Sequence, residues 1–581
     1  MPDRQKDRQA GYPSIDKPWL KYYSEEAITA ALPECKYTDL IWECNKDRLE
    51  KDALEFLGNR ITYGSFFQQI DQVAKGLISI GVKPGERITI FSINTPETLF
   101  FVFALNKLGA IPCLEYVTES QDEAVNAVNH YRSKVVVVLD MLLSRFNEIA
   151  DIETVQHMVI LPFSRSLPFS KRAIIKFKTE KIHCQKELSY SELLASGKNV
   201  TLTAVPYKKN SPAVIVHSGG TTGIPKSVVL SDLNINYVAW ALKTGCIDAK
   251  PDDLYYSCIP LFHAFGFVAG IITPLIFKNT LVLAVKYDED SFIQEFKRVR
   301  PNQTMSSSTY LPSFISDPQI QKMDLSFYKN MGMGGTPLAH ADEEKIDLFM
   351  KNHNSIARPS LGYGMSEVAS AACSEMNYYY GKTGSVGIPL CKVNIKAVDV
   401  ENQTELPYNQ EGELYISTPG LMLGYYNDEY ATKESIVTDA NGEQWIKTGD
   451  LGYIDEDGFV FITGRLKRIY TTRTDAKGAI FHIFPDYIAD TICSMDSVRE
   501  CVVVCISDPV LKSIPIAFIV SDSTCDENLS KEVSSFCNNK LPEHSRPKKV
   551  FVIEHIPRTP VGKFDYRILE EMAVDLYTEN G

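Results

Sequence analysis

Short apolar runs alternate along the chain with longer amphipathic stretches. The clearest helical pattern begins at Thr62, a suitable N-cap, repeats apolar residues at spacings of three and four, and can end at Gly81. Four β-branched runs have the length of buried strands: Arg87–Ile93, Val135–Leu139, Ala213–Val216 and Leu281–Val285. Strands that alternate with helices predict α/β layers.

The pattern changes after Gly464, where a short charged segment, RLKRIY, follows the turn-rich DEDG. Apolar strands are then predicted at Cys501–Ile506, Ile516–Val520 and Lys549–Ile553, around a helical pattern at Leu529–Asn538. These elements suffice for a separate domain of about a hundred residues. We therefore predict a large multi-layer α/β domain over residues 1–464 and a small α+β domain over residues 465–581, with the boundary at Gly464–Lys467.

Length and composition narrow the class of protein. The 581 residues exceed what one core usually organises, and the formal net charge of −13 argues against broad nucleic-acid binding. The 13 cysteines have no metal-ligand spacing, which is typical of a reduced cytoplasmic protein. The amino terminus is charged without a following apolar segment, so it does not read as a signal peptide. No run approaches the roughly 20 apolar residues that a membrane span needs.

A basic segment interrupts the acidic chain at residues 171–181. Lys171, Arg172, Lys176, Lys178 and Lys181 interleave there with apolar residues. A weak peripheral contact with an anionic membrane is one interpretation. An exposed helix or hairpin with a solvated face is the more common one, and we favour it.

The strongest chemical signal is VIVHSGGTTGIPKSVVL, from Val214 to Leu230. An apolar strand runs into a loop with three glycines and two threonines, and Lys226 follows. Glycines let backbone N–H groups approach a phosphate, while hydroxyls and an ammonium group add donors and charge. Ile224 and Pro225 separate the last glycine from Lys226, so the loop is not a Walker sequence. It predicts a phosphate site of another kind.

This loop resembles the phosphate-binding signature of the adenylate-forming, or AMP-binding, superfamily, which includes acyl-CoA synthetases, adenylation domains and luciferases. Six further segments resemble the superfamily's motifs in the same order: PLFHAFG (260–266), MGGTPL (333–338), GYGMSE (362–367), WIKTGD (445–450), GRLKR (464–468) and PRTPVGK (557–563). The resemblance covers nearly the whole chain. It implies an acyl-CoA-synthetase-like fold in which the small domain is a mobile catalytic lid.

The resemblance also assigns roles, residue by residue. It implies that the catalytic residues are Lys563, Thr222, Glu367 and His263, and that the hinge is Lys467. The residues it implies for ATP and AMP binding are Thr221, Thr222, Gly223, Lys226, Gly335, Thr336, Pro337, Gly362, Tyr363, Gly364, Met365, Ser366, Asp450 and Arg465.

These roles are chemically reasonable. Attack of a carboxylate on ATP brings two anions together, so catalysis depends on positioning and on neutralisation of charge. Glu367 offers the oxygen ligand that Mg²⁺ prefers. Asp450 can accept the ribose hydroxyls with support from Arg465, and Tyr363 can stack on adenine. Lys563 can bridge the carboxylate to the α-phosphate. The expected small molecules are ATP, Mg²⁺ and coenzyme A, or the phosphopantetheine arm of a carrier protein.

The predicted acyl pocket is apolar. Amino-acid adenylation domains usually place an aspartate in the segment aligned with PLFHAFG, and this chain has no acidic residue there. An unpaired ammonium group is costly to bury, which disfavours an amino acid. We place the pocket at Phe265, Gly266, Phe267 and Gly334, which favours a fatty or other apolar acid, with aryl acids as an alternative. The same residues can instead serve packing.

The chain departs from the family pattern after the hinge. Arg468 stands where an acidic residue is common, the loop over residues 470–482 is longer than usual, and Ser227 replaces a common glycine after the loop lysine. The long loop lies where the thiol acceptor approaches in relatives, so the acceptor stays open. With Lys467 and Arg473, Arg468 is also a candidate for a basic patch that docks an acidic carrier.

The leading hypothesis is an acyl-CoA synthetase that is AMP-forming and ATP- and Mg²⁺-dependent. A stand-alone ligase that loads an acyl carrier protein is the alternative of the same class. A nucleotide- or acyl-binding protein without turnover is the alternative of a different class, and the full set of charged residues disfavours it. A kinase is disfavoured because its catalytic-loop signature is missing.

Overall fold

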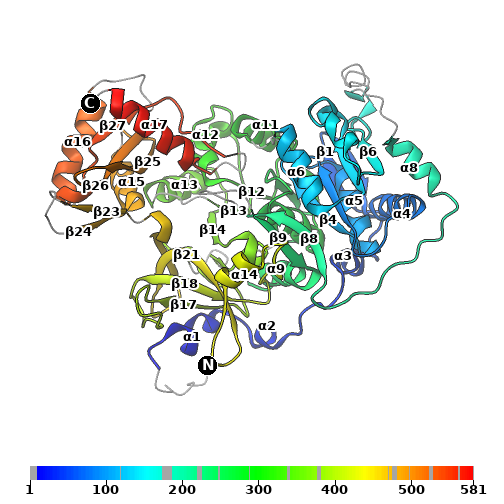
Figure 1. Cartoon of the computed structure of the whole chain (residues 1–581), viewed down its shortest axis with the longest axis horizontal. Helices are drawn as coiled ribbons and strands as arrows, with labels where there is room; N and C mark the ends of the chain where they lie inside the picture. Colours follow the sequence, from blue (N-terminus) through cyan, green and yellow to red (C-terminus); the bar gives the residue numbers. More distant parts are fainter. Residues whose placement is uncertain are drawn as a thin grey trace.

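The computed structural model describes residues 10–117, 120–169, 171–172, 186–218, 226–245, 249–286, 288–335, 340–375, 381–468, 470–473, 480–495, 497–521, 528–559 and 563–579. Two large mixed sheets with helices between and around them make up most of the chain (Figure 1). A five-stranded sheet and a C-terminal α+β unit follow. The predicted fold class is confirmed.

An eight-stranded sheet carries the phosphate-loop strands. Its order is β19 (Gly424–Tyr425), β9 (Ser227–Ser231), β8 (Pro212–His217), β4 (Ile111–Glu115), β3 (Arg87–Phe91), β5 (Val135–Leu139), β6 (His157–Leu161) and β7 (Glu187–Ser189). The strands from β8 to β7 are parallel, and β9 and β19 run antiparallel to their neighbours. Parallel strands are buried on both faces, which explains their continuous apolar runs.

A nine-stranded sheet carries the beginnings of the segments MGGTPL (333–338) and GYGMSE (362–367). Its order is β16 (Ile388–Pro389), β15 (Cys373–Ser374), β14 (Pro359–Tyr363), β13 (Asn330–Gly334), β12 (Gln303–Ser306), β10 (Leu254–Ser257), β11 (Thr280–Leu283), β1 (Asp52–Phe56) and β2 (Asn59–Thr62). The six strands from β14 to β1 are parallel. The carboxyl ends of β13 and β14 therefore reach the same edge of the sheet.

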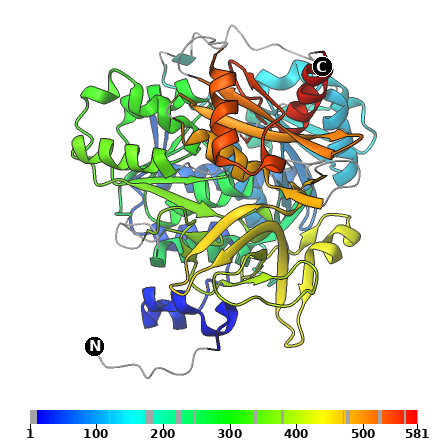
Figure 2. The ribbon, with the colours of Figure 1, turned by 90° about the vertical axis from the view of Figure 1, so that its left-hand side faces the viewer.

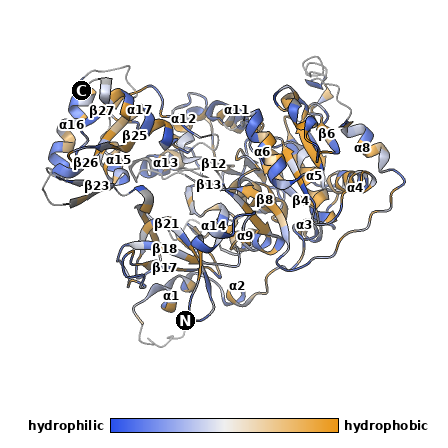
Figure 3. Cartoon of the chain, viewed as in Figure 1, coloured by the Kyte–Doolittle hydropathy of each residue, from blue (hydrophilic) through white to orange (hydrophobic). Residues whose placement is uncertain are grey.

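Two helices fill the space between the large sheets. Helix α4 (Tyr63–Ser79) contacts β1 and β2, α5 (Pro96–Leu108) contacts β4, and the two helices pack on each other. Thr62 caps α4 as predicted, because its hydroxyl accepts a hydrogen bond from the N–H of Ser65. One hydrophobic core runs through both sheets and these helices. Figure 3 shows the apolar residues concentrated on these inner elements and the polar ones on outer helices such as α16.

The chain then forms a five-stranded antiparallel sheet. Its strands are β17 (Asn394–Val398), β18 (Gly412–Ser417), β21 (Gln444–Ile454), β20 (Ile436–Thr438) and β22 (Val460–Arg465), with β22 paired to β21. Figure 2 shows this sheet below the large sheets and the C-terminal unit in front of them, in the upper half of the view. Residues 465–470 connect the five-stranded sheet to the C-terminal unit.

The C-terminal unit has cores of its own. It contains β23 (Tyr470–Arg473), β24 (Ile480–Ile483), α15 (Pro485–Cys493), β25 (Glu500–Asp508), β26 (Lys512–Val520), α16 (Leu529–Lys540), β27 (Lys549–Val552) and α17 (Tyr566–Glu579). One apolar cluster joins α15 and α16 to β25–β27, and a second joins α17 to the other face of these strands. The three strands and α16 lie within two residues of the predicted bounds, except that β26 begins four residues before the predicted start. The domain boundary itself stays a prediction.

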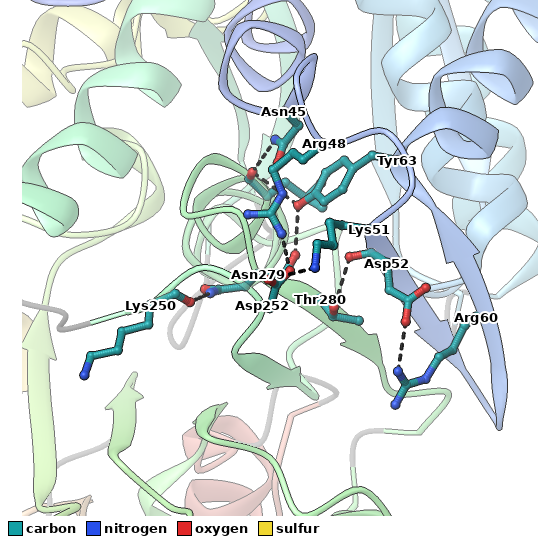
Figure 4. A network of polar contacts seen from close by, with 11 residues as sticks. Asn45, Arg48, Lys51, Asp52, Arg60, Tyr63, Lys250, Asp252, Asn279 and Thr280 are labelled. Carbon is teal, nitrogen blue, oxygen red and sulfur yellow. Dashed lines mark hydrogen bonds and ion pairs between the residues drawn. The ribbon is translucent and has the colours of Figure 1, made fainter.

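A polar network joins helix α3 (Tyr37–Asn45) and the turn that follows it to the amino ends of β10 and β11 in the nine-stranded sheet (Figure 4). Arg48 forms an ion pair with Asp252, and the Lys51 ammonium lies 3.6 Å from the same carboxylate. The Tyr63 hydroxyl donates to the carbonyl oxygen of Asn279 at 2.8 Å. These contacts pair polar groups where α3, α4 and the amino ends of β10 and β11 meet.

The basic segment 171–181 is described only at Lys171 and Arg172. The Lys171 ammonium donates to the carbonyl oxygen of Leu57, and the Arg172 guanidinium donates to that of Leu167. Residues 173–181 lie outside the described part of the chain, so the choice between a solvated face and a membrane contact stays open. No described helix has the length and apolar character that a membrane crossing requires.

Candidate active site

Hydrogen bonds join the two stems of the phosphate loop, which are Ser218 before the loop and Lys226 and Ser227 after it. The Ser218 N–H donates to the carbonyl oxygen of Lys226, and the Lys226 N–H donates to the Ser218 hydroxyl, both at 2.9 Å. The side chain of Lys226 is exposed, with its ammonium 4.5 Å above the Tyr425 ring. Residues 219–225, which include the predicted Thr221, Thr222 and Gly223, lie outside the described residues.

Glu367 is buried beside the first stem of the loop and is hydrogen-bonded. It lies in a short 3-10 turn, Ser366–Val368, where the Ser366 hydroxyl donates to the carbonyl oxygen of His217 at 2.7 Å. The Tyr425 hydroxyl donates to Oε1 of Glu367 at 2.8 Å. Burial raises the pKa of Tyr425, and the Glu367 carboxylate raises it further, so the phenol stays a donor.

The donor set at Glu367 fits Mg²⁺ in the mode that this cation usually adopts with nucleotides. Mg²⁺ binds through one or two carboxylates and completes its shell with water and phosphate oxygens. Oε1 of Glu367 accepts from Tyr425, whereas no described residue bonds its Oε2. The described residues contain no group of three or more His, Cys, Asp or Glu side chains placed to hold a metal, so no all-protein cage forms there. A single carboxylate oxygen is what a substrate-bound Mg²⁺ requires.

Glycines at the ends of β13 and β14 leave room beside the sheet edge. Gly334 pairs with Gly362, and Gly335 has φ +86°, a conformation that favours glycine. A Cβ at Gly364 would clash with the carbonyl oxygen of Ser370, so only glycine fits there. Met365 precedes the Glu367 turn. Thr336 and Pro337 lie outside the described residues.

Asp450 joins Tyr363, in the segment GYGMSE, to the end of β22. The Tyr363 hydroxyl donates to Oδ2 of Asp450 at 2.7 Å, and Arg465 Nε lies 2.9 Å from Oδ1. Asp450 and Arg465 are also cross-strand partners of β21 and β22. Each carboxylate oxygen can accept a second hydrogen bond, so Asp450 is oriented and keeps acceptor capacity for a ligand's hydroxyl groups.

Lys563 reaches this site from the C-terminal unit. A backbone hydrogen bond of 2.7 Å from Thr559 to the Lys563 carbonyl closes its turn. Its Cε lies 3.5 Å from the position of a Cβ at Gly335. Burial and Arg465 lower the pKa of Lys563 to about 8, while Asp450 and Glu367 oppose that shift. The ammonium group is therefore close to the predicted ribose and metal residues.

His263 is a buried neutral imidazole. Burial, with the charges of Lys563 and His217, lowers its pKa to about 3. Its Nε2 is buried and has no hydrogen-bond partner among the described residues. A buried polar atom of this kind ordinarily has a partner, so a bound molecule is a natural candidate for that role.

The four residues of the predicted acyl pocket differ in what they contact, and their role in binding an acid stays a prediction. The Phe265 ring lies beside Gly334, because a Cβ added to Gly334 would be 3.3 Å from Phe265 Cζ. Phe267 is fully buried with its ring 5.7 Å from that of Tyr37, so it packs the core toward α3. A Cβ on Gly266 would clash with the Pro260 carbonyl oxygen, so this glycine serves close backbone packing. Periodicity within the segment does not tell which residue faces which neighbour.

Two arginines flank the predicted hinge and are anchored on opposite sides of it. Arg465 pairs with Asp450 in the large part of the chain. Arg468 pairs with Asp486 at 2.5 Å, donates to the carbonyl oxygen of Val503 and lies 3.7 Å above the Tyr566 ring. Arg468 is buried, which contradicts its assignment to an exposed carrier-docking patch. The Lys467 side chain lies outside the described residues.

Comparison with known proteins decides the family. The model of the AMP-binding enzyme matches residues 41–426, more than half of the chain, and the model of the AMP-binding enzyme C-terminal domain matches residues 488–563. The chain belongs to the AMP-binding enzyme family. The predicted superfamily is thus confirmed and, at the level of the family, so is the predicted class of AMP-forming acid–thiol ligases.

Curated relatives of this AMP-binding enzyme cover almost its whole length. A 2-succinylbenzoate–CoA ligase of Bacillus cereus (strain Q1) is 25% identical, over 91% of this chain and 97% of the relative. A long-chain-fatty-acid–CoA ligase of Bacillus subtilis (strain 168) is 24% identical, over 97% and 99%. The chain is therefore similar in extent to whole CoA ligases.

Solved structures share the fold of this AMP-binding enzyme. An anthranilate CoA ligase in complex with anthranoyl-AMP gives a TM-score of 0.79 at 20% identity, over 94% of this chain and 99% of that one. ATP-bound MatB from Rhodopseudomonas palustris gives 0.78 at 21% identity, over 93% and 99%. These identities support the fold and not a particular substrate.

Sequence reasoning missed three polar side chains of this AMP-binding enzyme. Tyr425 bonds Glu367 from a strand 58 residues further along the chain. His217 and Glu115 are hydrogen-bonded to each other across 102 residues at the base of the phosphate loop. His217 stands inside the quoted loop segment, but no spacing within that segment indicates a partner so distant.

Proposed function

We propose that this AMP-binding enzyme is an acid–CoA ligase that activates a fatty or other apolar carboxylic acid as its acyl-adenylate and then transfers the acyl group to coenzyme A. One observation carries the proposal: the side chain of Lys563, from the C-terminal unit, lies beside Gly335 at the end of β13, with its Cε 3.5 Å from the position of a Cβ there. The influence of Asp450, Glu367 and Arg465 on the pKa of Lys563 agrees with this placement. The two parts of the chain thus enclose a single site with the charges that adenylation needs.

In the first step, a carboxylate oxygen of the acid attacks the α-phosphorus of ATP. The bond from that phosphorus to the oxygen bridging toward the β-phosphate breaks, and pyrophosphate leaves. Lys563 supplies a positive charge between the approaching anions, where it stabilises the transition state. Mg²⁺, when bound, neutralises charge on the departing phosphates, and Glu367 is the residue that would hold it. Lys226 and the phosphate loop bind the leaving group.

The nucleoside part of ATP is expected to lie between Gly362 and Asp450. Asp450 accepts from the ribose hydroxyls, and Tyr363 and Arg465 hold its carboxylate in place. Gly335 and Gly362 leave space for the flat adenine ring beside Tyr363. The network is preorganised, so little reorganisation is needed when ATP binds.

An apolar acid suits the surroundings of His263. Its neutral imidazole offers no charge that would favour a second carboxylate, and the neighbouring wall is made of Phe265 and Gly334. The segment 260–266 offers no carboxylate for an amino acid's ammonium group. The long-chain fatty acid named for one curated relative agrees with an apolar acid. The 2-succinylbenzoate named for the other carries a second carboxylate, so the relatives leave the identity of the acid to experiment.

Coenzyme A is the proposed acceptor. Its thiolate attacks the acyl carbon, the bond from that carbon to the phosphate oxygen breaks, and AMP leaves. The curated relatives named above are CoA ligases. Burial of Arg468 removes one cation of the basic patch considered for an acidic carrier, which favours coenzyme A over a carrier protein.

We also propose that residues 1–464 and 465–581 are domains and that the smaller one turns about Lys467 between the half-reactions. Arg465 is anchored to Asp450 and Arg468 to Asp486, so the short stretch between the two arginines is the natural place for rotation. Rotation there moves Lys563 away from the adenylate. The thiol then gains access from that side.

The proposal is tested by pyrophosphate release from ATP and Mg²⁺ with panels of fatty, aryl and amino acids. Each panel is run without acceptor, with coenzyme A and with a phosphopantetheinylated carrier protein. We expect release that depends on a fatty or aryl acid and turnover that rises with coenzyme A. ATP binding without any acid-dependent release would instead support the non-catalytic alternative.

The rate of adenylation is expected to fall as pH rises through about 8. Below this value Lys563 is protonated and charged; above it, the proton is lost, because burial and Arg465 have lowered its pKa from the ordinary 10.5 to about 8. The measurement is single-turnover pyrophosphate release from about pH 6.5 to 9.5 at saturating ATP and acid, a range that brackets this pKa. A rate that stays level across that range would show that the charge of Lys563 does not govern this step.

A further inference from the structure

A row of polar side chains, buried at Glu115 and His217 and half-buried at Ser227, crosses the base of the phosphate loop. Glu115 ends β4, His217 ends β8 and Ser227 begins β9, three strands that are neighbours in the eight-stranded sheet. His217 and Ser227 are cross-strand partners. The Glu115 carboxylate lies 2.8 Å from His217 Nε2, and both side chains are buried. Such a pair is costly to bury, so its place at the root of the loop calls for a role.

His217 connects three segments of the site. Its N–H donates to the carbonyl oxygen of Phe262, next to His263, and its carbonyl oxygen accepts from the Ser366 hydroxyl, next to Glu367. Its ring lies 5.1 Å from that of Tyr116. The Glu115 carboxylate helps to orient the His217 ring. Glu115 therefore acts, through one residue, on the phosphate loop, the His263 segment and the Glu367 turn.

The second stem of the loop has its own polar contact. The Tyr131 hydroxyl, at the end of α6 (Gln121–Tyr131), lies 2.7 Å from the Ser227 hydroxyl. Burial raises the pKa of Tyr131, and the neighbouring Glu115 carboxylate raises it further. Tyr131 and Glu115 are thus close together, and each stem of the loop is held by one of them. Ser227, where a glycine is common in the family, supplies the hydroxyl that this contact needs.

We propose that Glu115 and Tyr131 are positioning residues for adenylation, which hold the two stems of the phosphate loop in register with His263 and Glu367. This inference rests on the proposed function. In the proposed role, neither residue touches the reacting atoms. Their effect is to keep loop donors aligned with the phosphates, and a displacement of about 1 Å at such a site can cost roughly 100-fold in rate.

The test separates the two half-reactions. Glu115→Ala is expected to slow acid-dependent pyrophosphate release about 100-fold. It should leave the KM for the acid within about twofold and the rate of thioester formation from added acyl-adenylate unchanged, because that step no longer needs the loop. Glu115→Gln keeps an acceptor for His217 and should restore most of the rate. Equal losses in both half-reactions, or no rescue by Gln, would indicate a general structural role and overturn the proposal.

Glu97→Ala is the matched control. Glu97 is equally buried and hydrogen-bonded, at 2.6 Å to the Ser166 hydroxyl, and it has no hydrogen bond to the described residues of the three site segments. It should retain wild-type adenylation. If Glu115→Ala fails to fold, Tyr131→Phe removes one hydroxyl only and should slow pyrophosphate release about fivefold to tenfold. A wild-type rate for Tyr131→Phe would overturn its role.

Titration with ATP and Mg²⁺ distinguishes failure of this inference from failure of the proposed function. Glu115→Ala should bind ATP about tenfold more weakly than Glu97→Ala, whether or not any acid is turned over. If the wild type releases no pyrophosphate, the proposed reaction is refuted. If Glu115→Ala still binds ATP more weakly than Glu97→Ala in that case, the positioning role of Glu115 is retained. A wild type that turns over, with Glu115→Ala equal to it in rate and affinity, would refute the positioning role alone.

Discussion

Lys563→Ala is expected to lower the rate of adenylate formation by about 100-fold to 1,000-fold, the range observed when one preorganised transition-state donor is removed. The affinity for ATP should change little, because negative charge accumulates between acid and α-phosphate only as the reaction proceeds. Lys563 lies beside Gly335 and feels the charges of Asp450 and Glu367, so the substitution removes a positive charge from the site itself.

The measurement for Lys563→Ala is single-turnover pyrophosphate release, with ATP affinity determined separately by titration. Lys548→Ala is the control, because Lys548 is an exposed lysine of the same unit that lies just before β27. Thioester formation from added acyl-adenylate should survive in Lys563→Ala. Adenylation at the wild-type rate would remove Lys563 from the mechanism.

Glu367→Gln is expected to raise the Mg²⁺ concentration needed for half-maximal rate about tenfold or more and to slow adenylation about 100-fold. Glutamine keeps an acceptor for the Tyr425 hydroxyl, which donates to Glu367 at 2.8 Å, so the local hydrogen bond survives. What it removes is the negative charge that attracts the cation. The effect is therefore specific to charge and not to packing.

A Mg²⁺ titration of the first half-reaction measures this effect, and Glu375→Gln is the matched control. Glu375 is also buried and accepts a hydrogen bond from the N–H of Leu361. Burial raises the pKa of Glu375 to about 8, so at neutral pH its carboxyl group is mostly protonated and resembles the amide of glutamine. Glu375→Gln should keep the wild-type Mg²⁺ dependence. An unchanged Mg²⁺ titration in Glu367→Gln would exclude it as the ligand.

Local sequence determined many of the elements and the family. Helix α4 begins after Thr62 because a threonine hydroxyl satisfies the first free N–H groups of a helix, and this needs only neighbouring residues. The parallel strands are readable because burial on both faces requires continuous apolar runs, as in Val135–Leu139. The seven motifs likewise depend on residue type and order, and they were enough to place the chain in the AMP-binding enzyme family.

The tertiary structure alone decided which side chains meet. Phe267 faces Tyr37 and Phe265 faces Gly334, a difference set by the packing around one helical segment and not by its composition. Arg468 is buried against Asp486 and Tyr566, although a charged segment predicts exposure, because a nearby carboxylate and an aromatic ring replace its water.

The same holds for the polar contacts around the loop. Glu115 and His217 are 102 residues apart, and Tyr425 and Glu367 are 58 apart; strand order brings each pair together. A buried polar group must find a partner, but local sequence does not say where that partner is. The sequence by itself thus determined many of the helices and strands and the family, and it predicted the charged residues of the site, because these depend on residue type and on neighbours along the chain. Only the tertiary structure decided how those residues are held, because hydrogen-bond partners and packing are chosen across the sheets.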